Sequence, residues 1–277
     1  MTLMFAGRVV ALHRYPVKSM GGQGLAQAMI EPRGIAGDRR WLMVTPEGRF
    51  LTRRELPAMA LLHADLAPDP ADGGIVLSHR DGGALPVARP DGARPLAVQV
   101  WGDPVAAHDA GDAAAQWLTD RIGRAVRLVH MPDAAVRPVD PDFARAGDHV
   151  SFADGFPLLV ATVESLDALN RALPSPIPMA RFRPNLVIAG AVPFAEDGWR
   201  VLRVGDVTLR LAKPCTRCVV TTQDVDSGAV PDPLEPLRTL KAMGRVMPGA
   251  RAEPIFGVDA IPDGPGVIAV GDAVEVE

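Results

Sequence analysis

The chain has 277 residues, of which 48% are hydrophobic and 22% are charged. Both fractions are ordinary for a globular protein and exclude a disordered or collagen-like chain. The formal net charge is −4, which excludes a whole-chain positive field that would hold nucleic acid or an anionic membrane. There are only two cysteines, so a disulfide-stapled scaffold and a four-cysteine metal site built by this chain alone are also excluded.

The N-terminal residues do not predict a signal peptide. Arg8 and His13 interrupt the first apolar stretch, which therefore lacks the apolar core of a signal peptide. No run approaches the ~18 apolar residues that are needed to span a bilayer. We therefore expect no membrane span and a cytoplasmic location, where cysteines stay reduced.

Short β-branched runs separated by glycine and proline predict a β-rich fold in the first half of the chain. Strands are expected at residues 8–12 and 40–44. Residues 67–96 are rich in Pro, Asp, Gly and Ala and are expected to form loops or variable strand connections. A helix is expected over 113–122, with Asp112 as its N-cap and Gly123 at its end. Residues 131–148 have the composition of a loop and would separate the two halves of the chain.

The second half continues this pattern. A helix is expected to begin after Thr162, because Leu166, Leu169 and Leu173 share one helical face. A hairpin is expected over 201–211, where apolar residues alternate on both sides of a two-residue Gly-Asp turn. The remaining expected elements are strands at 186–188 and 267–270 and a possible helix at 234–243.

Cys215 and Cys218 stand three residues apart, with Lys213 and Arg217 beside them. A thioredoxin-type pair needs a helix N-terminus to lower a thiol pKa, whereas residues 219–222 are typical of a strand. A zinc site needs two further ligands, and no second cysteine pair or paired histidines supply them. A single thiolate that binds a transition metal remains open, and the neighbouring cations favour a thiolate. The alternative is that both cysteines are buried as small apolar side chains.

A basic cluster stands out in this acidic chain. Lys18 and Ser19 are followed closely by two glycines, and residues 33–55 contain six arginines against three acids. Arginine makes planar, bidentate contacts with phosphate, and glycines let backbone donors approach one. The cluster favours a compact anion such as a cofactor phosphate over a polynucleotide. The alternative is a solvated basic face.

A third group precedes the strand expected at 186–188. Strand alternation would place Arg181, Arg183 and Asn185 on one face, where the asparagine offers a donor and an acceptor. A charged strand edge that discourages pairing is the alternative. Asp154 lies in a turn, where an Asx-turn is the default.

In order along the chain, these groups resemble the MOSC superfamily, named for the C-terminal domain of molybdenum-cofactor sulfurase. Residues 15–19 through 52–57 look like its N-terminal β-barrel domain. The segments that look like the MOSC domain itself are 181–185, 195–199, 214–218 and 224–228. The resemblance implies a β-rich α+β fold, with an N-terminal MOSC-type β-barrel domain at 1–105 and a C-terminal MOSC β-barrel with a few helices at 106–277.

The resemblance to the amidoxime-reducing members of this superfamily implies a molybdenum-cofactor oxidoreductase. It implies that Cys218 binds the molybdenum and that Cys215 is a packing or supporting residue. The substrate would be a small N-hydroxylated or similar oxygenated compound, and bound water or Asp154 would relay protons. The residues that match the cofactor-binding positions are Lys18, Ser19, Arg39, Arg183 and Asn185, with Thr52, Arg54 and Asp154 nearby.

Electrons would come from a separate protein, because the four-cysteine ferredoxin domain of some bacterial relatives has no counterpart here. The donor would be ferredoxin-like, cytochrome b5-like or a flavin reductase. A second hypothesis is a sulfur carrier or sulfurtransferase with a persulfide on Cys218, or a carrier of the molybdenum cofactor. A labile added sulfur without a pterin would favour that hypothesis.

Overall fold

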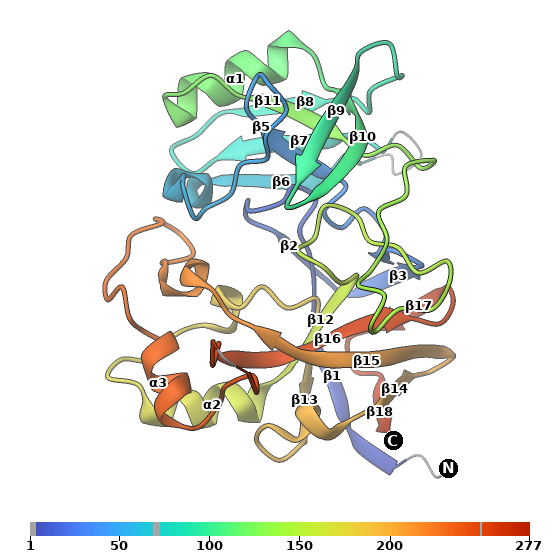
Figure 1. Cartoon of the computed structure of the whole chain (residues 1–277), viewed down its shortest axis with the longest axis vertical. Coiled ribbons are helices and arrows are strands. Elements are labelled where there is room, and N and C mark those ends of the chain that lie inside the picture. The colour runs from blue at the N-terminus through green and yellow to red at the C-terminus, as the bar shows by residue number, and fades with distance from the viewer. Residues whose placement is uncertain (1–3, 69–72, 250) are drawn as a thin grey trace.

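The computed structural model describes residues 4–68, 73–249 and 251–277. Strands dominate, and they gather in an N-terminal part, which is uppermost in Figure 1, and a C-terminal part below it. None of the helices in these ranges is long and apolar enough to cross a membrane.

The C-terminal part is a closed barrel. Its sheet runs β13-β12-β16-β15-β14-β18-β1-β2, and an additional pairing of β13 with β1 closes it around seven strands, leaving β2 outside. The strands are β1 (Met4–Arg14), β2 (Gln23–Leu25), β12 (Leu158–Thr162), β13 (Leu186–Ala189), β14 (Val201–Val204), β15 (Val207–Thr216), β16 (Ile255–Pro262) and β18 (Ala273–Val276). Because β1 comes from the N-terminus and pairs with both β13 and β18, the two ends of the chain are needed to complete one barrel.

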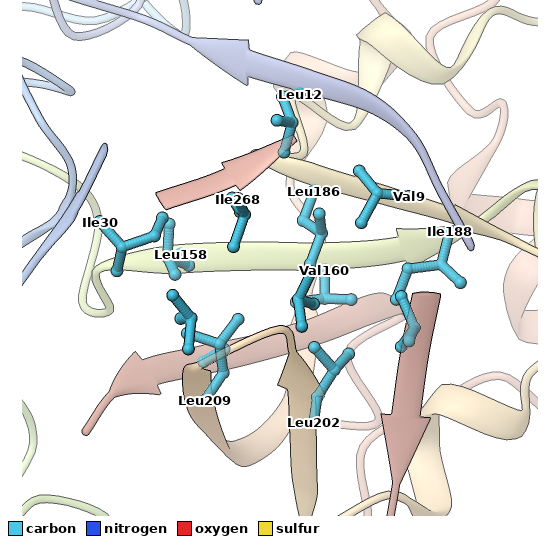
Figure 2. Packing of buried hydrophobic residues seen from close by; sticks show 14 of the residues in the cluster. Val9, Leu12, Ile30, Leu158, Val160, Leu186, Ile188, Leu202, Leu209 and Ile268 are labelled. Carbon is cyan, nitrogen blue, oxygen red and sulfur yellow. The ribbon is translucent and has the colours of Figure 1, made fainter. Parts of the chain in front are cut away.

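Apolar side chains fill the barrel interior. Figure 2 shows this core, in which Val9 and Leu12 from β1 lie with residues from several other strands, including Val160, Ile188 and Leu209. All five side chains are almost completely buried. Their burial favours closure, because a strand that lost its partner would return this apolar surface to water.

Leu209→Ala tests the importance of this core. Leu209 is fully buried, so we expect the variant to lower the free energy of unfolding by about 3 kcal/mol, from lost apolar burial and the cavity left behind. Val267, which is 51% exposed, supplies the control: Val267→Ala should change this free energy by less than about 0.5 kcal/mol. Urea unfolding of both variants measures the difference, and equal effects would contradict the barrel core.

The N-terminal part contains two sheets and one long helix. The first sheet runs β5-β11-β10-β9 and the second β6-β7-β8. Their elements are β5 (Trp41–Val44), η1 (Pro57–Leu61), β6 (Leu62–Leu66), β7 (Ile75–His79), β8 (Ala84–Val87), β9 (Pro95–Val100), β10 (Asp103–Asp109), α1 (Asp112–Ile122) and β11 (Arg127–His130). The division expected between residues 105 and 106 falls inside β10, whose sheet continues to His130.

The remaining elements join or cover these parts. β3 (Gln27–Glu31) pairs with β4 (Gly34–Ile35) and with β17 (Gly266–Ala269), so another segment from near the C-terminus meets the N-terminal region. The other helices are α2 (Val163–Ala172), η3 (Met179–Arg181), η4 (Ala195–Gly198), η5 (Val219–Thr222) and α3 (Leu237–Ala242).

The local predictions based on turns and caps are largely confirmed. Strands lie where expected in β1, β5, β13 and β17, and β14 and β15 form the expected hairpin around Gly205 at φ 55°. Thr162 caps α2 by accepting a hydrogen bond from the Ser165 amide at 3.2 Å. Gly123 ends α1 in the left-handed conformation. These features depend on neighbours in sequence, which explains why the sequence is enough to predict them.

Several expectations need correction. The N-cap of α1 is Gly111, while Asp112 lies in the first helical turn, where its carboxylate pairs with Arg94 and Arg127. In the 67–96 stretch, β7 and β8 pair as a hairpin; residues 69–72 lie outside the described residues. The strand-like residues 219–222 form the 3-10 helix η5, and the third helix is shorter than 234–243.

Candidate functional site

One cavity of about 480 Å³ lies where the two parts meet. Its walls contain all nine residues that the sequence analysis assigned to the site: Lys18, Ser19, Arg39, Thr52, Arg54, Asp154, Arg183, Asn185 and Cys218. They come from loops before and after strands of both parts. The tertiary structure therefore brings together residues that are up to 200 positions apart in the chain (18 to 218).

The backbone is strained around this cavity. Among the described residues, six that are not glycine have a positive φ, and four of these six line the cavity. The four are Ser19 (φ 69°), Arg39 (47°), Trp101 (54°) and Arg183 (56°). Each such conformation costs of the order of 1–3 kcal/mol and persists only where the surroundings enforce it. Backbone strain of this kind often clusters at functional sites, so the cavity is our candidate functional site.

Two guanidinium groups are fixed against one aromatic ring. Arg39 and Arg183 lie over the Tyr15 ring. Their Cζ atoms are 4.4 Å and 4.2 Å, respectively, from the ring centroid. Arg39 also donates to the Asp38 carboxylate at 2.6 Å and to Asn185 Oδ1 at 3.0 Å. Stacking and hydrogen bonds hold both cations in one orientation, which suits a planar or multidentate anion.

Arg183 has spare donor capacity. Its Nη1 donates to the Met20 carbonyl at 2.7 Å, but its Nη2 is buried and has no hydrogen-bond partner among the described residues. Burial lowers the pKa of Arg183 to about 9, and the repulsion of Arg39 and Arg53 acts in the same direction. A buried, cationic donor without a partner is costly, so an anionic ligand at this position would relieve the cost.

Lys18 and Asp154 form an ion pair in the cavity wall. The Lys18 Nζ donates to Asp154 Oδ1 at 2.5 Å, and the lysine side chain is 6% exposed. The carboxylate faces the open cavity and keeps 65% of its side-chain surface accessible. The surrounding protein raises the pKa of Asp154, but the charge and hydrogen bond of Lys18 outweigh this, and the pKa lies below its ordinary value. Asp154 is therefore an anion at neutral pH.

The two cysteines have different surroundings. Cys218 follows the end of β15 and precedes η5; its Sγ accepts a hydrogen bond from Arg54 Nη2 at 3.1 Å. Cys215 Sγ accepts one from Arg217 Nη1 at the same distance, yet burial raises the pKa of the Cys215 thiol far above its usual range. Cys215 is therefore expected to remain a thiol. Cys218 instead contacts Arg54, which belongs to the N-terminal part.

A metal at Cys218 would need to bring ligands with it. The described residues contain no group of three or more His, Cys, Asp and Glu side chains placed to hold a metal ion. The cavity instead offers one cysteine sulfur beside a basic wall that could bind a phosphate. This combination suits a metal that is already held by a sulfur-containing, phosphorylated organic ligand. The donor set thus fits the molybdenum cofactor better than a zinc site built from protein side chains.

Strand alternation does not explain how the 181–185 group is placed. Arg181 ends η3, and Arg183 has a left-handed backbone, so neither belongs to a strand. Both nevertheless line the cavity with Asn185. The chain reaches this arrangement through a turn that no period-two pattern describes.

Of the six arginines in 33–55, only Arg39 and Arg54 reach the cavity. The other four make structural contacts: Arg33 and Arg40 with the 131–135 segment, Arg49 with Glu55, and Arg53 with the Asp224 carbonyl. The phosphate-site interpretation therefore applies to two of the six.

Sequence reasoning missed several residues of the cavity wall. These are Trp101, Thr216, Glu253 and Asp259, and Arg217 was considered only as a neighbour of the cysteines. Trp101 lies under Arg54, whose Cζ is 4.7 Å from the ring centroid. No motif surrounds Asp259 or Trp101, and only the folded strands bring them to the cavity.

Comparison with known families agrees with this geometry. Residues 6–125 match the MOSC N-terminal beta barrel domain, and residues 147–275 match the MOSC domain. The chain belongs to the MOSC family. The human mitochondrial amidoxime-reducing component 1 is 34% identical over 285 residues, covering 98% of this chain and 83% of that protein. The human mitochondrial amidoxime reducing component 2 and the Xenopus laevis component 1 are each 31% identical, with 98% of this chain covered and 84% and 82% of theirs.

Family membership gives the cavity its context. The MOSC family and the amidoxime-reducing relatives support a reductase associated with the molybdenum cofactor. The cavity of this MOSC protein is walled by both of its domains, since Lys18 to Arg54 lie in the first match and Asp154 to Cys218 in the second.

Proposed function

We propose that this MOSC protein is a molybdenum-dependent oxidoreductase that removes oxygen from small N-hydroxylated compounds, with Cys218 as the protein ligand of the metal. The observation that carries the proposal is that Cys218 shares a cavity with Arg183, whose buried Nη2 has no hydrogen-bond partner among the described residues. The printed names of the relatives add support, because they describe amidoxime reduction in those proteins.

The cofactor would be held along the basic wall. Lys18, Arg39 and Arg183 offer cations, and Ser19 and Asn185 offer polar atoms, to a phosphate and a pterin. Thr52 and Arg54 lie beside them, toward Cys218. When bound, the cofactor supplies a metal centre that changes oxidation state by two electrons and accepts an oxygen atom.

The protein's own residues prepare that site. Arg54 Nη2 donates a hydrogen bond to the Cys218 Sγ at 3.1 Å and so holds the sulfur in the cavity wall, where a metal would bind it. The Asp154 carboxylate holds the Lys18 ammonium in place and leaves most of its own surface open to cavity water. Asp154 is our candidate for the group that orients this water near the substrate.

Electrons would reach the site from a separate donor protein, ferredoxin-like, cytochrome b5-like or a flavin reductase. The described residues contain no cysteine beyond the two at the cavity, so a second redox centre held by cysteines is not built into them. A cytoplasmic location stays a prediction.

The test uses the full chain produced in cells that make molybdenum cofactor. We expect molybdenum close to one atom per chain, pterin fluorescence after oxidation, and conversion of benzamidoxime to benzamidine with a chemical reductant. Mass spectrometry for a labile added sulfur examines the sulfur-carrier alternative on the same sample. A persulfide on Cys218 with no pterin would overturn the proposal and favour sulfur transfer.

A further inference from the structure

Asp259 is a second carboxyl group in the cavity wall. It lies in β16, between β12 and β15, opposite Leu159 on one side and Lys213 on the other. The next residue, Ala260, belongs to the barrel core, so the alternation of the strand turns Asp259 outward. There it lines the same cavity as Cys218 and Asp154.

The pairing of β15 with β16 is irregular beside this group. The register shifts between Leu211 and Lys213, and again between Pro214 and Thr216. Such bulges re-aim side chains and are frequent beside active sites. Here the second shift falls at Cys215, in the strand that pairs with β16 and Asp259.

Asp259 is half-buried and lacks a pairing cation among the described residues. It forms no salt bridge among the described residues, and its side-chain partner is the Cys215 thiol. The two nearby cations are engaged elsewhere: Lys213 lies over the Phe143 and Phe156 rings, and Arg217 donates to the Phe182 carbonyl at 2.6 Å. Nothing in contact with Asp259 fixes it as an anion.

Asp154, another carboxyl group of the cavity wall, has a cation beside it. Asp154 is held as an anion by Lys18 at 2.5 Å, so it has no proton to give at neutral pH. The third carboxyl group of the wall, Glu253, is exposed to solvent. Among the described residues, Asp259 is thus the half-buried carboxyl of the cavity that has no salt bridge.

We propose that Asp259 is the general acid of this cavity and gives a proton to the substrate nitrogen as its N–O bond breaks. The inference rests on the proposed function. The overall change is R–NHOH + 2e⁻ + 2H⁺ → R–NH₂ + H₂O. The separate donor protein supplies both electrons by way of the cofactor, and Asp259 supplies the proton of the new N–H bond. The oxygen atom that leaves the nitrogen is finally released as water, with the second proton taken from solvent. Cavity water then returns a proton to the Asp259 carboxylate.

The electrostatic surroundings agree with this role. Burial raises the pKa of Asp259 to about 6, against the opposing effects of the Cys215 hydrogen bond and the Arg217 and Lys213 charges. The Asp154 charge acts with burial. A carboxyl with a pKa near the working pH can both release and regain a proton in each cycle.

Asp259→Asn in the cofactor-loaded full chain is the first test, because it removes the proton and keeps the size. The parent should lose reduction rate about tenfold for each pH unit above 6, since the acid must be protonated to act. The variant should be about 100-fold slower at pH 6 and should lose this pH dependence.

Asp259→Glu, which retains a carboxyl group, should restore part of the pH-dependent rate. Asp206→Asn, at an exposed hairpin turn, is the matched control and should behave as the parent.

A second readout needs no turnover. The pKa of Asp259 is raised on folding, so its protonated form favours the folded state: that stabilisation is present below about pH 4 and lost as pH rises through 6. The Tm of Asp259→Asn should therefore rise relative to the parent by about 3 °C between pH 4 and pH 7. Molybdenum content should be equal in both.

The outcomes separate the two proposals. An active parent whose Asp259→Asn variant keeps the same rate and pH profile would overturn the acid role and leave the proposed function standing. A Tm difference that does not change with pH would also overturn the acid role, because the carboxyl would then not titrate in this range. A molybdenum-loaded parent that reduces no N-hydroxylated compound would overturn both.

Discussion

Replacing Cys218 by alanine is expected to abolish molybdenum retention and to lower the reduction rate at least about 1000-fold, because the metal loses its protein ligand and several kcal/mol of transition-state stabilisation. The substitution itself should be well tolerated by the fold. Cys218 is half-buried at the end of β15, where the following turn is held by its backbone, with Thr221 Oγ1 donating to the Cys218 carbonyl at 2.9 Å. Metal analysis and steady-state kinetics measure the loss, and thermal melting verifies folding.

Cys215→Ala is the matched control for this prediction. Cys215 stands three residues away, and an arginine also lies 3.1 Å from its sulfur. Its surroundings raise the pKa of its thiol, so we expect it to be a poorer metal ligand than Cys218. The variant should keep its molybdenum, with a rate within about tenfold of the parent, since only the contacts to Arg217 and Asp259 change. Loss of metal from Cys215→Ala, with retention in Cys218→Ala, would reverse the assignment of the two cysteines.

Two substitutions at Arg183 should separate its charge from its backbone conformation. Arg183→Gly and Arg183→Ala both remove the guanidinium, so each should lower cofactor retention by about 100-fold, as expected for loss of a buried charged contact to a phosphate. They should differ in stability. The backbone at Arg183 has φ 56°, which glycine adopts freely and alanine does not, so the glycine variant should be about 1 kcal/mol more stable than the alanine variant.

Pterin content after purification and urea unfolding of the cofactor-free proteins measure the two effects separately. Equal stability of the glycine and alanine variants would mean that the chain relaxes out of the left-handed conformation. Full cofactor content in either variant would remove Arg183 from the phosphate-binding wall. The parent provides the reference for both measurements.

The local features of this protein could be predicted because their causes are short-range. The Thr162 hydroxyl meets an amide three residues on, and Gly205 permits the positive φ of a two-residue hairpin turn. The errors arose where a more distant partner intervened. Asp112 pairs with Arg94 and Arg127 within the first turn of α1, and residues 219–222 form a 3-10 helix in the cavity wall, to which Val220 and Thr221 belong.

The sequence by itself determined the β-rich class, the MOSC resemblance and the basic and thiol groups of the site, because spacing and residue type are enough to express them. The two cysteines first excluded a four-thiolate centre, and that limit still holds. Only the tertiary structure decided which cations share a cavity with Cys218, and that the surroundings of Cys215 raise the pKa of its thiol. It also revealed Asp259, an acid in the middle of a strand that no motif marks. The reason is physical: the pKa, the ion pairing and the accessibility of a side chain are set by neighbours that closure of the barrel brings together.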